Sequence, residues 1–322
     1  MPSEIPNESA PVMADQTNPG GGAVGYSVGT VSRRAPTADR LDSEISGLDA
    51  LEQPVAPRQP LLPRLWKATW PKVAAVAIGL GIWQLVVWSG HWPEYVLPGP
   101  ATVFRELVRE FQSGVMPKAI RITLTRAVQG YTLAILIGGF VGLAVSRSRT
   151  LRSAVGSLIT GLQTMPSIAW FPLAILLFKL TDAAILFVVV LGAAPSIANG
   201  IIAGADNVPP ILVRAGRVLG ARGLNLSRFV ILPASMPSVL AGLKQGWAFA
   251  WRSLMAGEII VIIANQPSIG FQLQSGRDLA DAPALMAAMV VILVIGILVD
   301  SVVFGTAERV MRRRRGLIDP SN

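Results

Sequence analysis

Six long apolar segments restrict what this chain can fold into. They cover residues 70–89, 124–146, 158–180, 183–205, 239–263 and 284–306. Each is near the length that an α-helix needs to cross about 30 Å of hydrocarbon at a rise of about 1.5 Å per residue. Because a backbone in lipid must satisfy its own hydrogen bonds, such segments form helices. The sequence therefore predicts an all-α polytopic membrane protein, with six transmembrane helices in one domain over residues 63–322.

The composition excludes several classes of function. Charged residues make up 15% of the chain, against about 25% in a typical soluble domain. There is no cysteine and only one histidine, His91, so we expect no disulfide, no thiolate nucleophile and no metal site built from these residues. The net charge of +9 suits basic cytoplasmic loops. We therefore expect a lipid bilayer, and not nucleic acid, around the chain.

Residues 1–62 differ from the rest of the chain. Nine prolines precede Arg64, and three glycines follow one another at Gly20, Gly21 and Gly22. Such a stretch buries too little apolar surface to offset the entropy lost on ordering. It also has no apolar core at the N-terminus, which a signal peptide requires. The sequence predicts a disordered cytoplasmic tail here.

The distribution of Lys and Arg predicts the orientation of the spans. Six spans place both termini on one side of the membrane, and the flanks of the spans on that side then hold fifteen basic residues, against seven on the other side. The fifteen are Arg64, Lys67, Lys72, Arg147, Arg149, Arg152, Arg214, Arg217, Arg222, Arg228, Arg309, Arg312, Arg313, Arg314 and Arg315. The seven are Arg105, Arg109, Lys118, Arg121, Arg126, Lys179 and Arg277. Because cytoplasmic loops carry the excess, both termini are predicted to be cytoplasmic.

Two segments depart from simple spans. The third apolar segment contains Pro166 and Pro172, so we expect it to be kinked or broken. Residues 101–111 follow Pro98-Gly99-Pro100 and have apolar residues at helical spacing, which predicts an amphipathic helix at the outer interface. Gly138 and Gly142 form a pair of small residues four apart, which indicates close helix packing.

The loop over residues 206–236 is longer than two adjacent spans need. Pro209-Pro210 can begin a helix, since proline suits the first turn, and Gly220 and Gly223 can end it or bend it sharply. A second short helix is expected from about Asn225 to Pro233. The alternative, a plain amphipathic loop, has the same composition.

This loop resembles a motif of ATP-binding-cassette (ABC) importer permeases. The family motif reads Glu-Ala-Ala, three residues, Gly, nine residues, then Ile-x-Leu-Pro. The chain has Arg214-Ala215-Gly216, three residues, Gly220, nine residues, then Val230-Ile231-Leu232-Pro233. Arg replaces the family's Glu, and Gly216 replaces its second Ala. The coupling loop that the resemblance implies is formed by Arg214, Ala215, Gly216, Gly220, Val230, Leu232 and Pro233.

Other short segments resemble permeases of the nitrate, sulfonate and taurine group within this family. They are Leu97-Pro98-Gly99-Pro100, Thr164-Met165-Pro166, Ala256-Gly257-Glu258-Ile259 and Ser268-Ile269-Gly270-Phe271. The resemblance implies the type I importer permease fold in a bacterial plasma membrane. It also implies import of a small anion, such as an aliphatic sulfonate, taurine or nitrate.

The resemblance also implies which partners do the rest. Two permeases, identical or paired, would enclose the pathway, and two ATP-binding subunits would each receive one coupling loop. An extracytoplasmic substrate-binding protein would deliver the substrate. ATP and Mg²⁺ would be bound by the ATPase, because the chain contains no Gly-xxxx-Gly-Lys-Ser/Thr phosphate loop and is not expected to be an enzyme. The alternatives are import of another small solute, such as a cofactor precursor, or a stand-alone secondary transporter.

Three charges fall inside predicted spans: Arg252, Glu258 and Asp300. An unpaired charge in hydrocarbon is costly, so each should face the bundle interior or water. One hypothesis is that the three residues pair with one another. The other is that Arg252 contacts the anion in the pathway.

Overall fold

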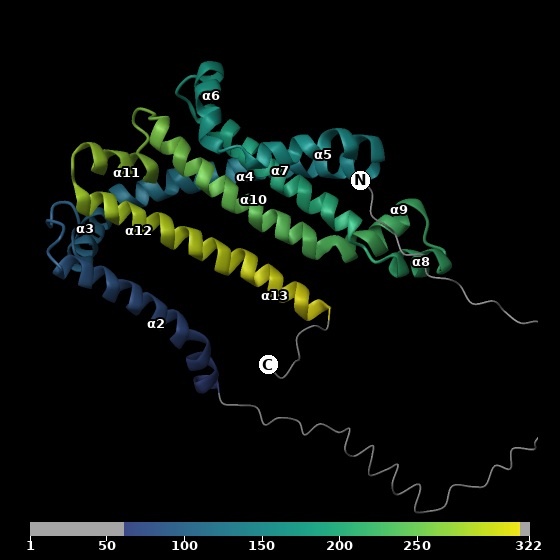
Figure 1. The fold of residues 1–322 in the computed structure, drawn as a ribbon, viewed down its shortest axis with the longest axis horizontal. Helices are drawn as coiled ribbons and strands as arrows, with labels where there is room; N and C mark the ends of the chain where they lie inside the picture. The colour runs from purple at the N-terminus through teal and green to yellow at the C-terminus, as the bar shows by residue number, and fades with distance from the viewer. Residues whose placement is uncertain (1–60, 316–322) are drawn as a thin grey trace, which may run out of the picture. The chain divides into compact units, whose positions relative to one another are not determined.

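The computed structural model describes residues 61–315, which form helices joined by short connections and contain no strand in that range (Figure 1). The predicted tail lies outside these residues except for its last two positions. The elements are α2 (Leu61–Trp88), α3 (Pro100–Gln112), α4 (Val115–Arg147), α5 (Arg149–Thr164), η1 (Ser167–Trp170), α6 (Phe171–Phe178), α7 (Asp182–Asp206), α8 (Pro210–Val218), α9 (Gly223–Leu226), η2 (Ser227–Ile231), α10 (Leu232–Ile260), α11 (Ile269–Asp278), α12 (Ala282–Val299), η3 (Asp300–Phe304) and α13 (Gly305–Arg314).

All six predicted spans fall on helices. Within residues 61–315, four helices are long and apolar enough to cross a membrane: Thr69–Trp88, Val115–Arg147, Asp182–Asp206 and Ala282–Arg313. The broken pair Thr150–Thr164 and Ser167–Phe178 makes a fifth candidate. The remaining predicted span is α10, a 29-residue helix that carries three charged residues and is not among these candidates.

The third predicted span is broken, as its prolines indicated. Its two halves meet at an angle of 101°. Met165 and Pro166 lie between them in extended conformations, and Pro172 occupies the first turn of α6. Proline is tolerated in a first helical turn, because the amide that it lacks has no partner there.

The core lies where α4, α7 and α10 pack side by side. Small residues allow this close approach. A Cβ on Gly200 would lie 2.5 Å from the Cα of Gly242, and the reverse is equally true. Gly138 and Gly142 of α4 similarly meet the backbone of α7 at Ala194 and Ala198. The predicted role of this pair in helix packing is confirmed, within the single chain.

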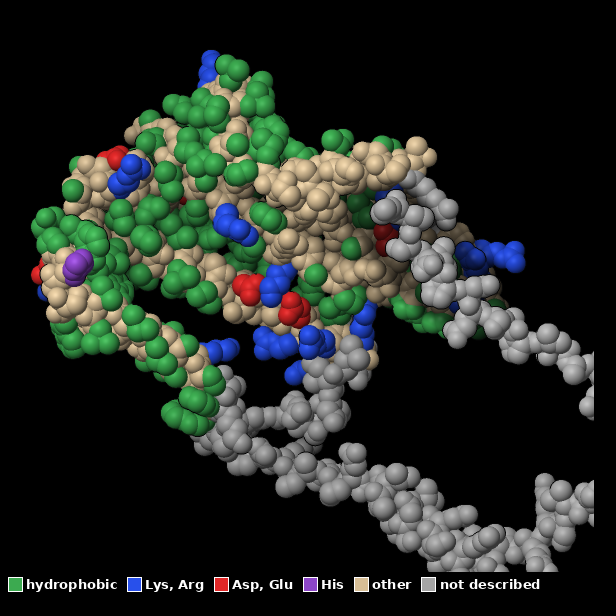
Figure 2. All heavy atoms as spheres, viewed as in Figure 1, with side chains coloured by type: hydrophobic (Ala, Val, Ile, Leu, Met, Phe, Trp, Pro, Cys, Tyr) green, Lys and Arg blue, Asp and Glu red, His purple; other side chains and the backbone are tan. Residues whose placement is uncertain are grey.

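Exposed surfaces of the spans are largely apolar. Figure 2 shows hydrophobic side chains over much of one face, and Lys and Arg side chains gathered where α13 ends. The predicted amphipathic helix is α3, which begins at Pro100 and packs against α12. It buries Val103 and leaves Phe104, Val108 and Phe111 exposed. Its location at the outer interface stays a prediction.

Candidate functional site

The loop between α7 and α10 begins with a short, well-defined helix. Pro209 precedes α8, and Pro210 is its first residue, as the sequence predicted. Val208 is buried just before the helix and anchors it. The loop is therefore built around an ordered helix rather than an irregular connection, and it lies at the end of α7 away from α6 (Figure 1).

A glycine turn closes α8. The amide of Ala221 donates to the carbonyl of Gly216 at 2.9 Å, and the amide of Gly220 donates to that of Arg217 at 3.0 Å. Gly220 has φ +86°, in the left-handed region where residues with a Cβ are strained. A Cβ at Gly220 would meet nothing within 4 Å. The backbone angle, and not a steric clash, therefore accounts for the glycine.

At Gly216, in contrast to Gly220, close packing explains the absence of a side chain. It is the one buried residue of α8. A Cβ there would lie 2.8 Å from Cγ2 of Val230 and 3.0 Å from Cδ1 of Leu226. The replacement of the motif's second alanine thus accompanies tight packing of α8 against the segment that follows it.

The second short helix is not a separate element. α9 begins at Gly223, with φ +54°, and runs through the π-helical turn η2 directly into α10. Pro233 lies in the first turn of α10, where its carbonyl accepts a hydrogen bond from Arg315. The expectation that this helix ends at Pro233 is wrong. α9, η2 and α10 therefore form one continuous helical segment.

The outer surface of the loop is apolar at its tip and basic around it. We call Val218, Leu219 and Gly220 the α8 tip. Val218 is 88% exposed and Leu219 is 86% exposed. The other exposed residues of the loop include Ile211, Leu212, Arg214, Ala215, Arg217, Arg222, Arg228 and Phe229. An exposed apolar tip with basic flanks is typical of a surface that another protein covers.

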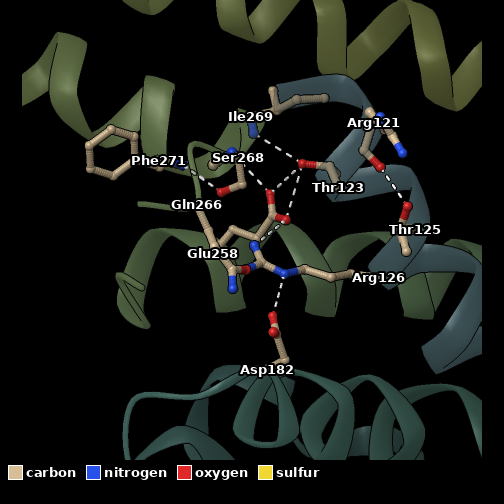
Figure 3. Close-up of polar contacts among 11 residues, drawn as sticks. Arg121, Thr123, Thr125, Arg126, Asp182, Glu258, Gln266, Ser268, Ile269 and Phe271 are labelled. Atoms are coloured by element: carbon tan, nitrogen blue, oxygen red, sulfur yellow. Dashed lines mark hydrogen bonds and ion pairs between the residues drawn. The ribbon is translucent and has the colours of Figure 1, made fainter. Parts of the chain in front are cut away.

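A buried polar cluster lies at the ends of α7 and α10 that are far from this loop (Figure 3). The side chain of Glu258 is fully buried. Its oxygens accept hydrogen bonds from Thr123 Oγ1 at 2.8 and 3.1 Å, from Arg126 Nη1 at 3.0 Å and from the Gly270 amide at 3.1 Å. Thr123 Oγ1 in turn accepts from the Ile269 amide at 3.0 Å. This cluster joins α4, α10 and the start of α11.

Arg126 extends this cluster to two further segments. Its Nε donates to Asp182 at the start of α7 at 2.7 Å, and its Nη2 donates to Gln266 at 2.7 Å. All three nitrogens of the guanidinium therefore have partners. In the sequence analysis, Arg126 was counted among the seven basic residues of the outer side, and its role in this cluster was not predicted. Its position as the third residue of an apolar segment was the available signal that it lies within a helix bundle.

The three predicted intramembrane charges do not pair with one another. Glu258 pairs with Arg126. Asp300 lies 3.3 Å from Lys244 Nζ, which also lies 3.4 Å from Glu308. Arg252 is exposed, and its Nε donates to the Ala248 carbonyl at 3.1 Å. Among the described residues, the hypothesis that the three pair with one another is wrong, because Arg252 and Glu258 of α10 and Asp300 of η3 contact different neighbours.

Residues 130–316, more than half of the chain, match the family model described as binding-protein-dependent transport system inner membrane component. The chain belongs to this family. The permease is thus a multi-pass inner-membrane protein and the membrane component of an ABC importer, in which a separate ATPase subunit binds and hydrolyses ATP. It is itself no enzyme.

Individual relatives agree with this membership. The permease is 30% identical to a probable ABC transporter permease protein of Brucella melitensis, over 70% of this chain and 89% of that one. It is 27% identical to the taurine transport system permease protein of Escherichia coli, covering 74% and 90%. It is 26% identical to the nitrate import permease protein of Synechocystis, covering 71% and 86%.

A solved structure supports the fold. The permease superposes on a chain of the inward-facing MetNI methionine ABC transporter with a TM-score of 0.53 and 18% identity, covering 62% of this chain and 95% of that one. The type I importer permease fold expected from the sequence is confirmed.

Proposed function

We propose that this permease imports a small anion, and that the α8–α9 loop is the surface through which ATP-driven motion of an ATPase subunit reaches the spans. The observation that carries the proposal is the exposed α8 tip on a helix that packs, through Gly216, against a segment continuous with α10. A displacement of α8 is thereby transmitted to α10 as a rigid-body movement. The basic flanks favour an acidic surface on the ATPase.

The names of the relatives support an anion as the cargo. Taurine carries a sulfonate and nitrate is an oxyanion, and the permeases named for them match this chain over more than 70% of its length. A second permease, of the same sequence or a paired one, completes the pathway in this proposal. An extracytoplasmic substrate-binding protein delivers the anion, in keeping with the description of the family.

The proposal fixes an orientation. α8 must face the cytoplasm to meet an ATPase, and the excess of basic residues on its side agrees with this. The termini then lie in the cytoplasm. The α3 end and the Glu258 cluster then lie toward the outside.

Two variants of the α8 tip test the proposal. Leu219→Asp places a charge on the apolar surface, and Gly220→Val forces a branched side chain into a left-handed backbone conformation, at a cost of about 1–2 kcal/mol. Both sites are open to solvent, so insertion and abundance should hold. We expect at least a tenfold loss of ATPase co-purification, or hydrolysis without uptake. Arg214→Ala should weaken the complex modestly and most at low salt, because exposed charges are screened.

The matched control is Gly139→Val in α4. A Cβ at Gly139 also meets nothing within 4 Å, and its φ is not in the left-handed range. It should leave both association and uptake unchanged. Normal uptake with the ATPase bound, in both tip variants, would show that this loop is not the coupling element.

A further inference from the structure

One face of α10 stays uncovered within the chain, and it is unusual in composition. Ala241, Gln245 and Arg252 are exposed, and Ala248 between them is partly exposed. Steps of four, three and four residues place these positions along one side of a helix. We call these four residues the α10 stripe. It contains two small residues, an amide and a guanidinium.

The uncovered face of α12 shows the contrast. Its exposed residues are large and apolar: Met289, Leu293, Val294, Ile297 and Leu298. Such side chains suit contact with lipid, whereas a stripe of alanine, glutamine and arginine does not. In contrast to the exposed face of α12, the α10 stripe is therefore suited to water or to polar partners.

Arg252 is held in place but has no acidic partner. Its Nε donates to Ala248, one turn earlier, and its guanidinium carbon lies 4.9 Å from the centre of the Phe249 ring. The other two charged residues of α10 are paired, Lys244 with Asp300 and Glu258 with Arg126. Among residues 61–315, no carboxylate lies within ion-pairing distance of Arg252. These contacts leave both Nη groups available to donate.

Such an arginine is costly unless it meets water or an anion. An arginine at the centre of a transmembrane helix costs about 2.5–3.5 kcal/mol even on insertion scales that allow it to relax. Arg252 lies near the middle of the predicted span 239–263. The cost of this unpaired, exposed charge therefore indicates a functional role for Arg252.

We propose that Arg252 binds the transported oxyanion inside the translocation pathway. This inference rests on the proposed function. A planar guanidinium donates two parallel hydrogen bonds, which match the spacing of oxygens in nitrate, sulfonate and carboxylate groups. The contact with the Phe249 ring restricts the movement of that guanidinium.

Gln245 provides a second polar contact along the same stripe. It lies seven residues before Arg252, about 10 Å along the helix axis and toward α8. An amide offers donors without a charge, so an anion that leaves Arg252 meets a weaker site next. Movement through a pore requires such a step, because a site that binds too tightly does not release.

The test uses the importer reconstituted in liposomes from this permease, its ATPase and its binding protein, with nitrate, taurine and methanesulfonate as probes. Arg252→Gln should lower uptake of the transported probe at least tenfold while the ATPase still co-purifies. Arg252→Lys keeps the charge and loses the planar guanidinium, so its uptake should lie between that of the wild type and that of Arg252→Gln. The control is Arg121→Gln, an exposed arginine of α4, which should transport normally.

Three outcomes would overturn the inference. Unchanged uptake by Arg252→Gln would remove Arg252 from the pathway and leave the proposed importer intact. A loss of permease pairing or of abundance in this variant, with uptake per assembled complex unchanged, would show that Arg252 instead pairs with another chain. If the wild-type importer moves none of the three probes, the proposed cargo class fails, and the site fails with it.

Discussion

Breaking the buried Arg126–Glu258 pair should be the most damaging single change to folding. Removal of Arg126 leaves the fully buried carboxylate of Glu258 with neutral donors only, the Thr123 hydroxyl and the Gly270 amide. Removing one partner of a buried ion pair costs about 3–5 kcal/mol, because an uncompensated charge stays behind. Asp182 also loses its partner, but this adds little to the cost, since its side chain is 45% exposed and can be hydrated. We therefore expect Arg126→Met to lower the free energy of unfolding by about 3–5 kcal/mol.

The pair of charges, and not the shape of Arg126, should set this cost. Glu258→Gln keeps the outline of the side chain and removes the charge, so it should cost about 1–3 kcal/mol, the loss of charged hydrogen bonds. The double variant Arg126→Met with Glu258→Gln should be less destabilised than the sum of the two single variants, because no bare carboxylate remains.

Unfolding by sodium dodecyl sulfate in mixed micelles, followed by tryptophan fluorescence, measures these differences. Trp247 and Trp251 lie in the core of the bundle and report its loss. Arg121→Met, five residues earlier in α4 and exposed, is the control and should stay within about 0.5 kcal/mol of the wild type. A cost below about 1 kcal/mol for Arg126→Met, or strict additivity in the double variant, would refute the reasoning.

Two further predictions concern the α3 side and the orientation of the chain. Burial, together with the nearby Glu106 and Asp281 carboxylates, raises the pKa of Glu110 from 4.5 to about 7, and its buried Oε2 has no hydrogen-bond partner. The stability that its protonated form contributes is complete below about pH 4.5 and is lost as the pH rises through 7. Glu110→Gln should therefore flatten the fall in thermal midpoint over this window, and an unchanged slope would contradict it. Reporter fusions at Arg315 and Glu94 should lie on opposite sides, with Arg315 cytoplasmic; the same side for both would exclude the six-span orientation.

The sequence by itself determined the parts of this protein whose causes are local. Hydrophobic length predicted the helices, and Pro166 predicted the break in the third span, because a proline ring disrupts a helix wherever it occurs. Gly220 was predicted to end α8, and its left-handed backbone conformation is a property of that residue alone. The spacing of the motif over residues 214–233 also pointed to the family, since recognising a sequence motif needs no knowledge of packing.

The tertiary structure decided everything that depends on which helix faces which. Glu258 and Arg126 are 132 residues apart, so no sequence window contains both, and their pairing follows from the packing of α4 against α10. Gly216 is explained only by the approach of Val230 to α8. The same packing turns Arg252 outward and leaves it without a carboxylate among the described residues. The sequence identified these charges, but only the arrangement of the helices determined that Glu258 and Arg126 are buried as a pair and that Arg252 is exposed.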